Sequence, residues 1–203
     1  MPLCFYKRRV IMPNWCYTSY VITGNAEDVR DLYEKMCSLE EREQSLVENG
    51  LGKTWLGNLV VLLGEDWKNI YCRGWWENLN KDCDDGALRF DVMSAWCEMT
   101  DVRRFICGKY PSLEVYFVSE EPNMVIYETN DVNGEYFPEQ LKIEQAGHED
   151  EYCEDWEDIF QKVSERTGVL VHDRTSMNKV LENYNREHED ACIVIREFEY
   201  AEE

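Results

Sequence analysis

The stretch from Leu88 to Glu120 constrains the fold most, because its side-chain pattern changes period twice. Residues 88–95 alternate apolar and polar side chains, the period of two that is typical of a half-buried strand. Residues 101–110 place apolar side chains at helical spacing, and Pro111 cannot continue a helix. Residues 113–120 alternate again. The pattern therefore predicts a strand, a helix and a second strand, with Thr100 as the N-cap of the helix.

Upstream of this unit the same signals predict a strand rich in aromatic and β-branched residues, a helix capped by Asn25, and another strand. Asp85-Gly86 is a hairpin signal that joins this strand to Leu88. The resulting order, β-α-β-β-α-β, is the split β-α-β or ferredoxin-like arrangement, an α+β fold with both helices on one face of an antiparallel sheet. The predicted elements are Trp15–Thr23, Ala26–Leu39, Tyr71–Leu79, Leu88–Ala95, Asp101–Tyr110 and Leu113–Glu120.

The sequence divides into three regions. Residues 1–11 are basic, and Met12 resembles a second start, so we expect an N-terminal extension there. Residues 12–145 form the ferredoxin-like domain, with an insertion at about 49–69 that carries a short apolar helix and with a final hairpin of Met124–Thr129 and Tyr136–Glu144 around Asn133-Gly134. The helix that follows the first strand is expected to run on through 40–43. Residues 146–203 form an acidic C-terminal extension packed on the domain.

In this extension, the apolar spacing predicts two helices and a closing strand. Gly168 ends the first helix, Thr175 or Ser176 caps the second, and Ala191–Phe198 forms the strand.

The net charge of the chain limits the classes of molecule that it can bind. The chain of 203 residues carries 42 acidic and 21 basic side chains, a formal net charge of -21. Binding to phosphate backbones or anionic membranes requires a surplus of Lys and Arg, so both are disfavoured. An acidic surface serves solubility, or it mimics nucleic-acid charge to occupy a basic protein.

Cysteine usage indicates the compartment. The 9 Cys are an odd number, with no Cys-x-x-Cys pair and no His at zinc-ligand spacing. The sequence also has no apolar run of the roughly 20 residues that span a bilayer. We therefore expect reduced thiols, a cytoplasmic protein, and no cofactor, metal or membrane contact.

Short motifs resemble the YubB-type ferredoxin-like family carried by plasmids and phages. The resemblance covers Met12 to about Gly134. It implies a ferredoxin-like fold and an accessory gene of a mobile element, and it brings no catalytic residues. The sequence departs from the family at Cys97-Glu98-Met99, where a proline-containing turn is typical. The motifs are Met12-Pro13-Asn14-Trp15-Cys16, Val21-Ile22-Thr23-Gly24, Ala26-Glu27-Asp28-Val29, Arg73-Gly74-Trp75, Phe90 to Trp96, Tyr110-Pro111-Ser112-Leu113 and Glu120-Glu121.

The candidate protein-binding residues lie in the acidic run of the extension. Carboxylates at this place are explained more simply by a helix N-terminus, where they offset the helix dipole. The functional interpretation is an acidic face with aromatic anchors for a basic protein. The residues are Glu149, Asp150, Glu151, Tyr152, Glu154, Asp155, Trp156, Glu157 and Asp158.

The sequence supports base stacking, nucleophilic catalysis and calcium binding less well than it supports protein binding. Trp75 and Trp76 with Arg73 suit stacking of bases on a sheet face, although core packing explains the tryptophans as well. His172-Asp173 with Cys153 or Cys192 offers a nucleophile and a base without a surrounding signature. The aspartates at 82, 84 and 85 fail the calcium-loop pattern and fit a hairpin turn better.

The sequence therefore predicts a non-enzymatic mobile-element factor that binds another protein. The partner is expected to be a basic nucleic-acid-binding or defence protein, inhibited through the acidic surface. A nucleic-acid-binding module that uses the sheet aromatics is the alternative, and an enzyme with an unrecognised site comes third. The oligomeric state stays open.

Overall fold

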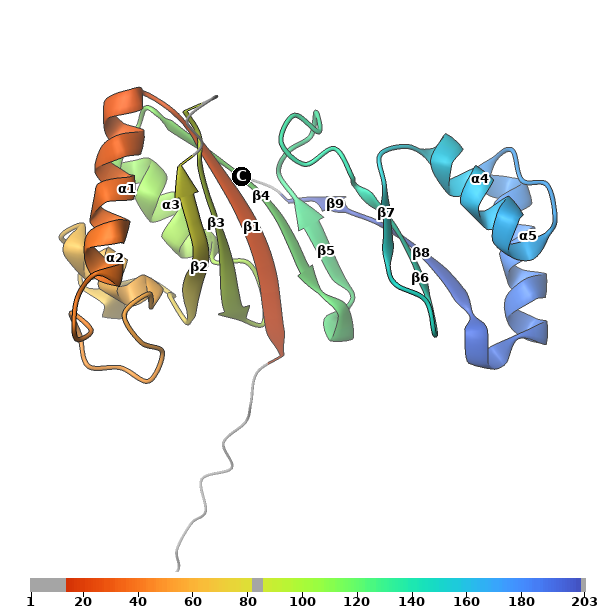
Figure 1. Cartoon of the computed structure of the whole chain (residues 1–203), viewed down its shortest axis with the longest axis horizontal. Helices are drawn as coiled ribbons and strands as arrows, with labels where there is room; N and C mark the ends of the chain where they lie inside the picture. Colours follow the sequence, from red (N-terminus) through yellow and green to blue (C-terminus); the bar gives the residue numbers. More distant parts are fainter. Residues whose placement is uncertain (1–13, 82–85, 202–203) are drawn as a thin grey trace, which may run out of the picture.

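The computed structural model describes residues 14–81 and 86–201, and it shows an α+β fold with two sheets (Figure 1). Three helices cover one side of a six-stranded sheet, and a three-stranded sheet backed by two helices lies on its other side. The prediction of an α+β fold is confirmed. The predicted extension at residues 1–11 and the aspartates at 82, 84 and 85 lie outside the described residues.

The larger sheet has the strand order β2-β3-β1-β4-β5-β9. Its long central strand β1 pairs antiparallel with β3 on one side and with β4 on the other. The β2–β3 and β4–β5 pairs are also antiparallel, whereas β5 and β9 are parallel. The strands are β1 (Trp15–Gly24), β2 (Gly74–Lys81), β3 (Leu88–Ala95), β4 (Leu113–Glu121), β5 (Ile126–Thr129) and β9 (Glu199–Tyr200).

Three helices pack on one face of this sheet: α1 (Ala26–Glu40), α2 (Leu56–Leu62) and α3 (Thr100–Lys109). The Asn25 side chain accepts a hydrogen bond from the Glu27 N–H, so its predicted role as N-cap of α1 is confirmed. Two short 3-10 helices complete the domain: η1 (Trp67–Asn69) lies between α2 and β2, and η2 (Pro122–Met124) lies between β4 and β5. The core between helices and sheet includes Ile22, Leu32, Met36, Leu59, Trp76, Leu88 and Phe117.

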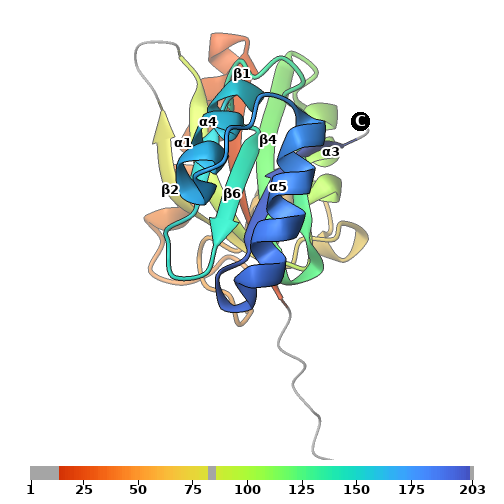
Figure 2. The ribbon, with the colours of Figure 1, turned by 90° about the vertical axis from the view of Figure 1, so that its right-hand side faces the viewer.

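The second sheet has the order β7-β6-β8 and its own core. Its strands are β6 (Leu141–Gln145), β7 (Glu151–Cys153) and β8 (Ile193–Glu197). The helices α4 (Trp156–Thr167) and α5 (Arg174–Glu187) lie in front of β6 in Figure 2, on the face turned away from the larger sheet. The 3-10 helix η3 (Glu189–Ala191) leads into β8. The core includes Ile143, Cys153, Ile159, Val163, Met177 and Ile193.

The last strand links the two sheets. Residues 193–197 pair with β6, the Phe198 N–H bonds to the Gln140 carbonyl, and residues 199–200 then pair with β5. The two sheets therefore share one continuous stretch of chain. Gly168 ends α4 with a φ of 72°, the left-handed C-cap that the sequence predicts.

Several predicted boundaries in the first domain were wrong. β2 begins at Gly74, because the Tyr71 N–H bonds to the Asp101 carboxylate instead of a neighbouring strand. Helix α1 ends at Glu40 and does not continue through 40–43. Thr100 is the first residue of α3, not its cap, and its hydroxyl donates to Glu98.

The predicted hairpin around Asn133-Gly134 was also wrong. β5 pairs with β4, and β6 pairs with β7 and β8, so the two predicted strands belong to different sheets. The connection between them is held by Asp131, whose carboxylate accepts the N–H groups of residues 135, 136 and 137. Asp173, not Thr175 or Ser176, caps α5. Residues 151–153, expected before a helix, form β7.

We predict that Leu59→Ala lowers the free energy of unfolding by about 2–5 kcal/mol, the usual cost of emptying a buried leucine site. Leu59 is 1% exposed and belongs to the insertion, which the structure makes part of the main core. Leu62→Ala in the same helix is the matched control, because Leu62 is 36% exposed. Denaturant unfolding measures both, and equal losses for the two variants would contradict the assignment of α2 to the core.

Candidate functional site

The acidic run lies where the second sheet turns into α4. Glu151 and Tyr152 are in β7, and the Asp155 carboxylate caps α4 by accepting the Asp158 N–H at 2.9 Å. The dipole explanation therefore holds for the carboxylates from Asp155 onward. It does not account for Glu149, Asp150 and Glu151, which lie in the turn before β7 and in β7 itself. Glu154 lies between β7 and the cap residue Asp155.

About half of these carboxylates are neutralised within the chain. Asp150 lies 2.9 Å from the Lys142 ammonium. Glu151 pairs with Arg166 and Lys162, and the hydrogen bond from Arg166 is the main cause that lowers its pKa. Asp158 lies 3.2 Å from Lys162.

Apart from Asp155, which caps α4, three carboxylates of the set remain, and these are not neutralised by a described residue. Glu149, Glu154 and Glu157 are exposed, and none of them has an ion pair or a hydrogen bond with another residue that the structure describes. The structure thus separates the predicted acidic set into residues that stabilise the fold and residues whose charge faces solvent.

The two aromatic members are also held by the chain. The Tyr152 hydroxyl donates to Glu120 at 2.9 Å, and burial together with the nearby Glu120 charge raises the pKa of Tyr152 to about 12. Tyr152 as a whole residue remains 38% exposed. The guanidinium of Arg174 lies 3.9 Å from the Trp156 ring centre, so this tryptophan is covered by its own chain. Tyr152 is therefore the more accessible aromatic of the pair.

A buried lysine lies where the two sheets meet. The Lys142 side chain, on β6, is 3% exposed, and its ammonium lies 2.8 Å from Glu120 of β4. Glu144 is 3.6 Å away, and the rings of Tyr127 and Tyr152 have their centres 5.3 and 5.2 Å from the ammonium. Burial alone lowers the pKa of Lys142, but the hydrogen bonds to Glu120 and Asp150 outweigh it, so the pKa is raised. This lysine is charged and joins the two sheets electrostatically.

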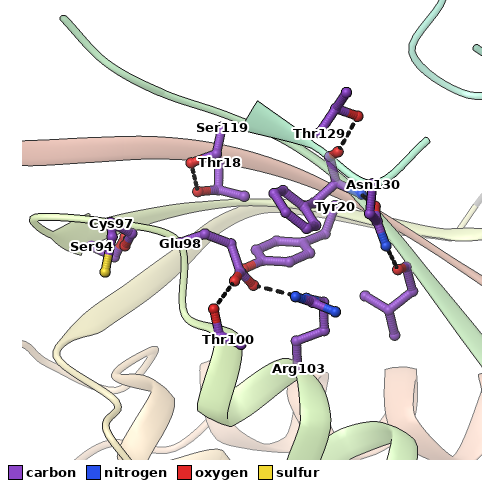
Figure 3. Close-up of polar contacts among 12 residues, drawn as sticks. Thr18, Tyr20, Ser94, Cys97, Glu98, Thr100, Arg103, Ser119, Thr129 and Asn130 are labelled. Atoms are coloured by element: carbon purple, nitrogen blue, oxygen red, sulfur yellow. Dashed lines mark hydrogen bonds and ion pairs between the residues drawn. The ribbon is translucent and has the colours of Figure 1, made fainter. Parts of the chain in front are cut away.

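A second polar cluster is buried between the larger sheet and α3, and the sequence analysis did not identify it (Figure 3). The Glu98 carboxylate accepts the Tyr20 hydroxyl at 2.7 Å, the Thr100 hydroxyl at 2.6 Å and the Arg103 Nε at 3.2 Å. Arg103 also lies 4.9 Å from the Phe117 ring centre. Burial and the Glu98 charge raise the pKa of Tyr20. The departure from the family pattern at Cys97-Glu98-Met99 was the signal that could have found this cluster.

Beside it, three small polar side chains form a buried chain of contacts. The Ser119 hydroxyl lies 2.9 Å from both the Cys16 sulfur and the Thr18 hydroxyl. The apolar cavity next to Tyr20 and Arg103 holds about 10 Å³, barely the space of one water. The cavity has no room for a substrate. We therefore assign these groups a structural role, in which they position β1, β4 and α3.

The nucleic-acid candidates are not brought together on one exposed face. Trp76 is fully buried on the helix-covered face, where its Nε1 donates to Glu40 at 2.9 Å, so its assignment to a base-stacking surface was wrong. Trp75 lies on the opposite face, packed edge-on against Trp15 with ring centres 4.9 Å apart. Its Nε1 donates to Glu77, a carboxylate that repels phosphate.

The described contacts join neither Cys153 nor Cys192 to His172. Cys153 is 1% exposed, and burial raises its pKa to about 11, which keeps it a thiol at neutral pH. The His172 and Asp173 side chains lie 3.2 Å apart but are exposed, and Asp173 serves as the helix cap. Cys192 contacts the carbonyls of residues 185, 188 and 189.

Among the residues that the structure describes, no group of three or more His, Cys, Asp or Glu side chains is arranged to hold a metal ion. In the same part of the chain, each helix is too short or too polar to cross a membrane.

We predict that Lys142→Ala lowers the free energy of unfolding by about 3–5 kcal/mol, because it leaves Glu120 and its neighbours uncompensated at a buried junction. Lys179→Ala is the matched control, since Lys179 is exposed and has no ion pair among the described residues. Chemical denaturation monitored by circular dichroism compares the two. A loss for Lys142→Ala no larger than that of the control would contradict the role of this lysine.

No protein-family model matches the sequence, and comparison with curated proteins and with solved structures finds no match either. The resemblance to the YubB-type family therefore stays a prediction.

Proposed function

We propose that this chain is a non-catalytic protein-binding factor that recognises a basic partner through an acidic face. The face consists of the exposed carboxylates of Glu149 and Glu154, which lie on either side of β7, and of Glu157 at the start of α4. A basic nucleic-acid-binding or defence protein fits this face, and occupation of its basic surface would inhibit it. The observation that carries the proposal is that these three carboxylates have no cation partner among the residues that the structure describes, whereas Asp150, Glu151 and Asp158 beside them do.

Whether a carboxylate serves the fold or attracts a partner depends on the charges beside it. A structural carboxylate is placed near a cation or a helix N-terminus, as Glu151 and Asp155 are. Glu157 lies in the first turn of α4, where it offsets the helix dipole, whereas Glu149 and Glu154 lie outside the helix. All three carboxylates face solvent, so they steer a positively charged partner toward the surface and raise the association rate. The net charge of -21 extends this attraction over the whole molecule.

The strand order supports a ferredoxin-like first domain. Within β2-β3-β1-β4, the sequence order β-α-β-β-α-β and the two helices α1 and α3 on one face correspond to the split β-α-β arrangement. Such a topology suits the accessory protein of a plasmid or phage that the sequence motifs resemble. The fold hosts many functions, so the proposal for function depends on the acidic face.

The nucleic-acid alternative loses its best residue with the burial of Trp76. For catalysis, the candidate nucleophile Cys153 is buried and keeps its proton, and the sulfur of the partly buried Cys192 lies against backbone carbonyls.

We predict that replacing Glu149, Glu154 and Glu157 together by Gln weakens binding of a lysine-rich peptide about tenfold at low salt, mainly through slower association. Binding to the unmodified chain should weaken as salt rises from ~50 to ~500 mM, because the screening length shortens over this range. Surface plasmon resonance measures both rates.

The matched control replaces Glu41, Glu43 and Glu48 by Gln, which removes the same charge from the exposed loop after α1. The control should bind nearly as well as the unmodified chain. Equal weakening by both triple variants would show that net charge alone attracts the peptide, and the proposed face would then be abandoned.

A further inference from the structure

A pocket of about 270 Å³ lies between the open face of the larger sheet and the second sheet. Its walls come from β1, β4, the loop before β6, β7 and the residue after β8. Half of the lining residues are aromatic, two are carboxylates, and none is Lys or Arg. The side chains that matter are those of Tyr17, Glu120, Tyr136, Phe137, Glu139 and Tyr152.

Aromatic rings and carboxylates together form the chemistry that binds organic cations. The face of an aromatic ring attracts an ammonium or a guanidinium within about 6 Å of its centre, and a carboxylate supplies the countercharge. This junction already binds cations of its own chain in that way. Lys142 lies over Tyr127 and Tyr152, and Arg196 lies over Tyr127 at 5.5 Å while its Nε donates to Glu144.

The pocket still contains groups that can contact a further cation. Tyr17 is 45% exposed, and Tyr152 is 38% exposed although its ring centre already lies 5.2 Å from the Lys142 ammonium. Both residues therefore still present surface to solvent. Glu139 is exposed and has no ion pair or hydrogen bond among the described residues. Burial, then the charge and hydrogen bonding of Asp91, raise the pKa of Tyr17, which keeps its hydroxyl neutral. Each of these groups favours a positively charged occupant.

We propose that this pocket receives a lysine or arginine side chain of a basic partner and so anchors the complex. This inference rests on the proposed function, because the pocket supplies a specific contact beside a face that attracts by charge. Tyr152 belongs both to the acidic run and to the lining of the pocket, so the two surfaces are neighbours. A volume of about 270 Å³ is below the range of pockets for whole cofactors, and it suits a single long side chain.

The test uses the full chain and three acetylated, amidated tripeptides: Gly-Lys-Gly, Gly-Arg-Gly and the neutral Gly-Gln-Gly. NMR titration should show that the two basic peptides shift the signals of Tyr17, Phe137 and Tyr152, whereas the neutral peptide does not. Tyr17→Ala and Glu139→Gln should each weaken binding about two- to fivefold, the effect of one exposed cation–π contact or one exposed ion pair.

Two variants serve as controls. Tyr71→Ala removes a tyrosine of similar exposure (44%) that does not line the pocket, and Glu135→Gln removes a charge from the same loop as Glu139. Both should leave the affinity unchanged. Glu139→Gln replaces one carboxylate oxygen by an amide nitrogen on an exposed side chain, so we expect the fold to be unchanged. This variant therefore tests the pocket even if Tyr17→Ala perturbs β1.

The outcomes separate the two proposals. If the peptides bind, and only the triple Gln variant at residues 149, 154 and 157 weakens them, the pocket is wrong and the acidic face stands. If Tyr17→Ala and Glu139→Gln weaken binding but the triple variant does not, the pocket stands and the acidic face is wrong. Equal binding of the neutral and basic peptides would overturn both.

Discussion

The buried ammonium of Lys142 is the interaction on which the arrangement of the two sheets depends. Its carboxylate partners come from β4, from β6 and from the turn before β7, and its aromatic neighbours come from β5 and β7. A buried charge that loses its partners is costly, so the sheets cannot slide or separate without exposing Lys142. The same contacts fix the distance between the sheets, and this distance creates the aromatic pocket beside them.

Local patterns were the predictable part of the fold. The alternation at Leu88–Ala95 and the spacing in 101–110 reflect neighbours along the chain, and the structure places a strand and a helix there with boundaries shifted by one residue at most. The pairing of β6 depended on a partner that follows it by about fifty residues. Asn133-Gly134 carried a hairpin signal, but Asp131 used the neighbouring N–H groups for a different turn.

The site was less predictable for a similar reason. Acidic side chains at 149–158 were visible in the sequence, but whether each was compensated depended on Lys142, Lys162 and Arg166. Lysine is seldom buried, so no pattern could assign Lys142 to the junction. Trp76 and Trp75 are adjacent in the chain and therefore point to opposite faces of a strand, which a period of two already implied. The pocket combines residues from five separate segments, and no local motif predicts such a combination.

The most direct test is a crystal structure of the chain with the acetylated, amidated Gly-Lys-Gly peptide bound. The account predicts that the lysine ammonium lies within about 6 Å of the Tyr17 or Tyr152 ring centre, at hydrogen-bonding distance from the Glu139 carboxylate. An ammonium bound only along α4, with the pocket between the sheets empty, would contradict the account.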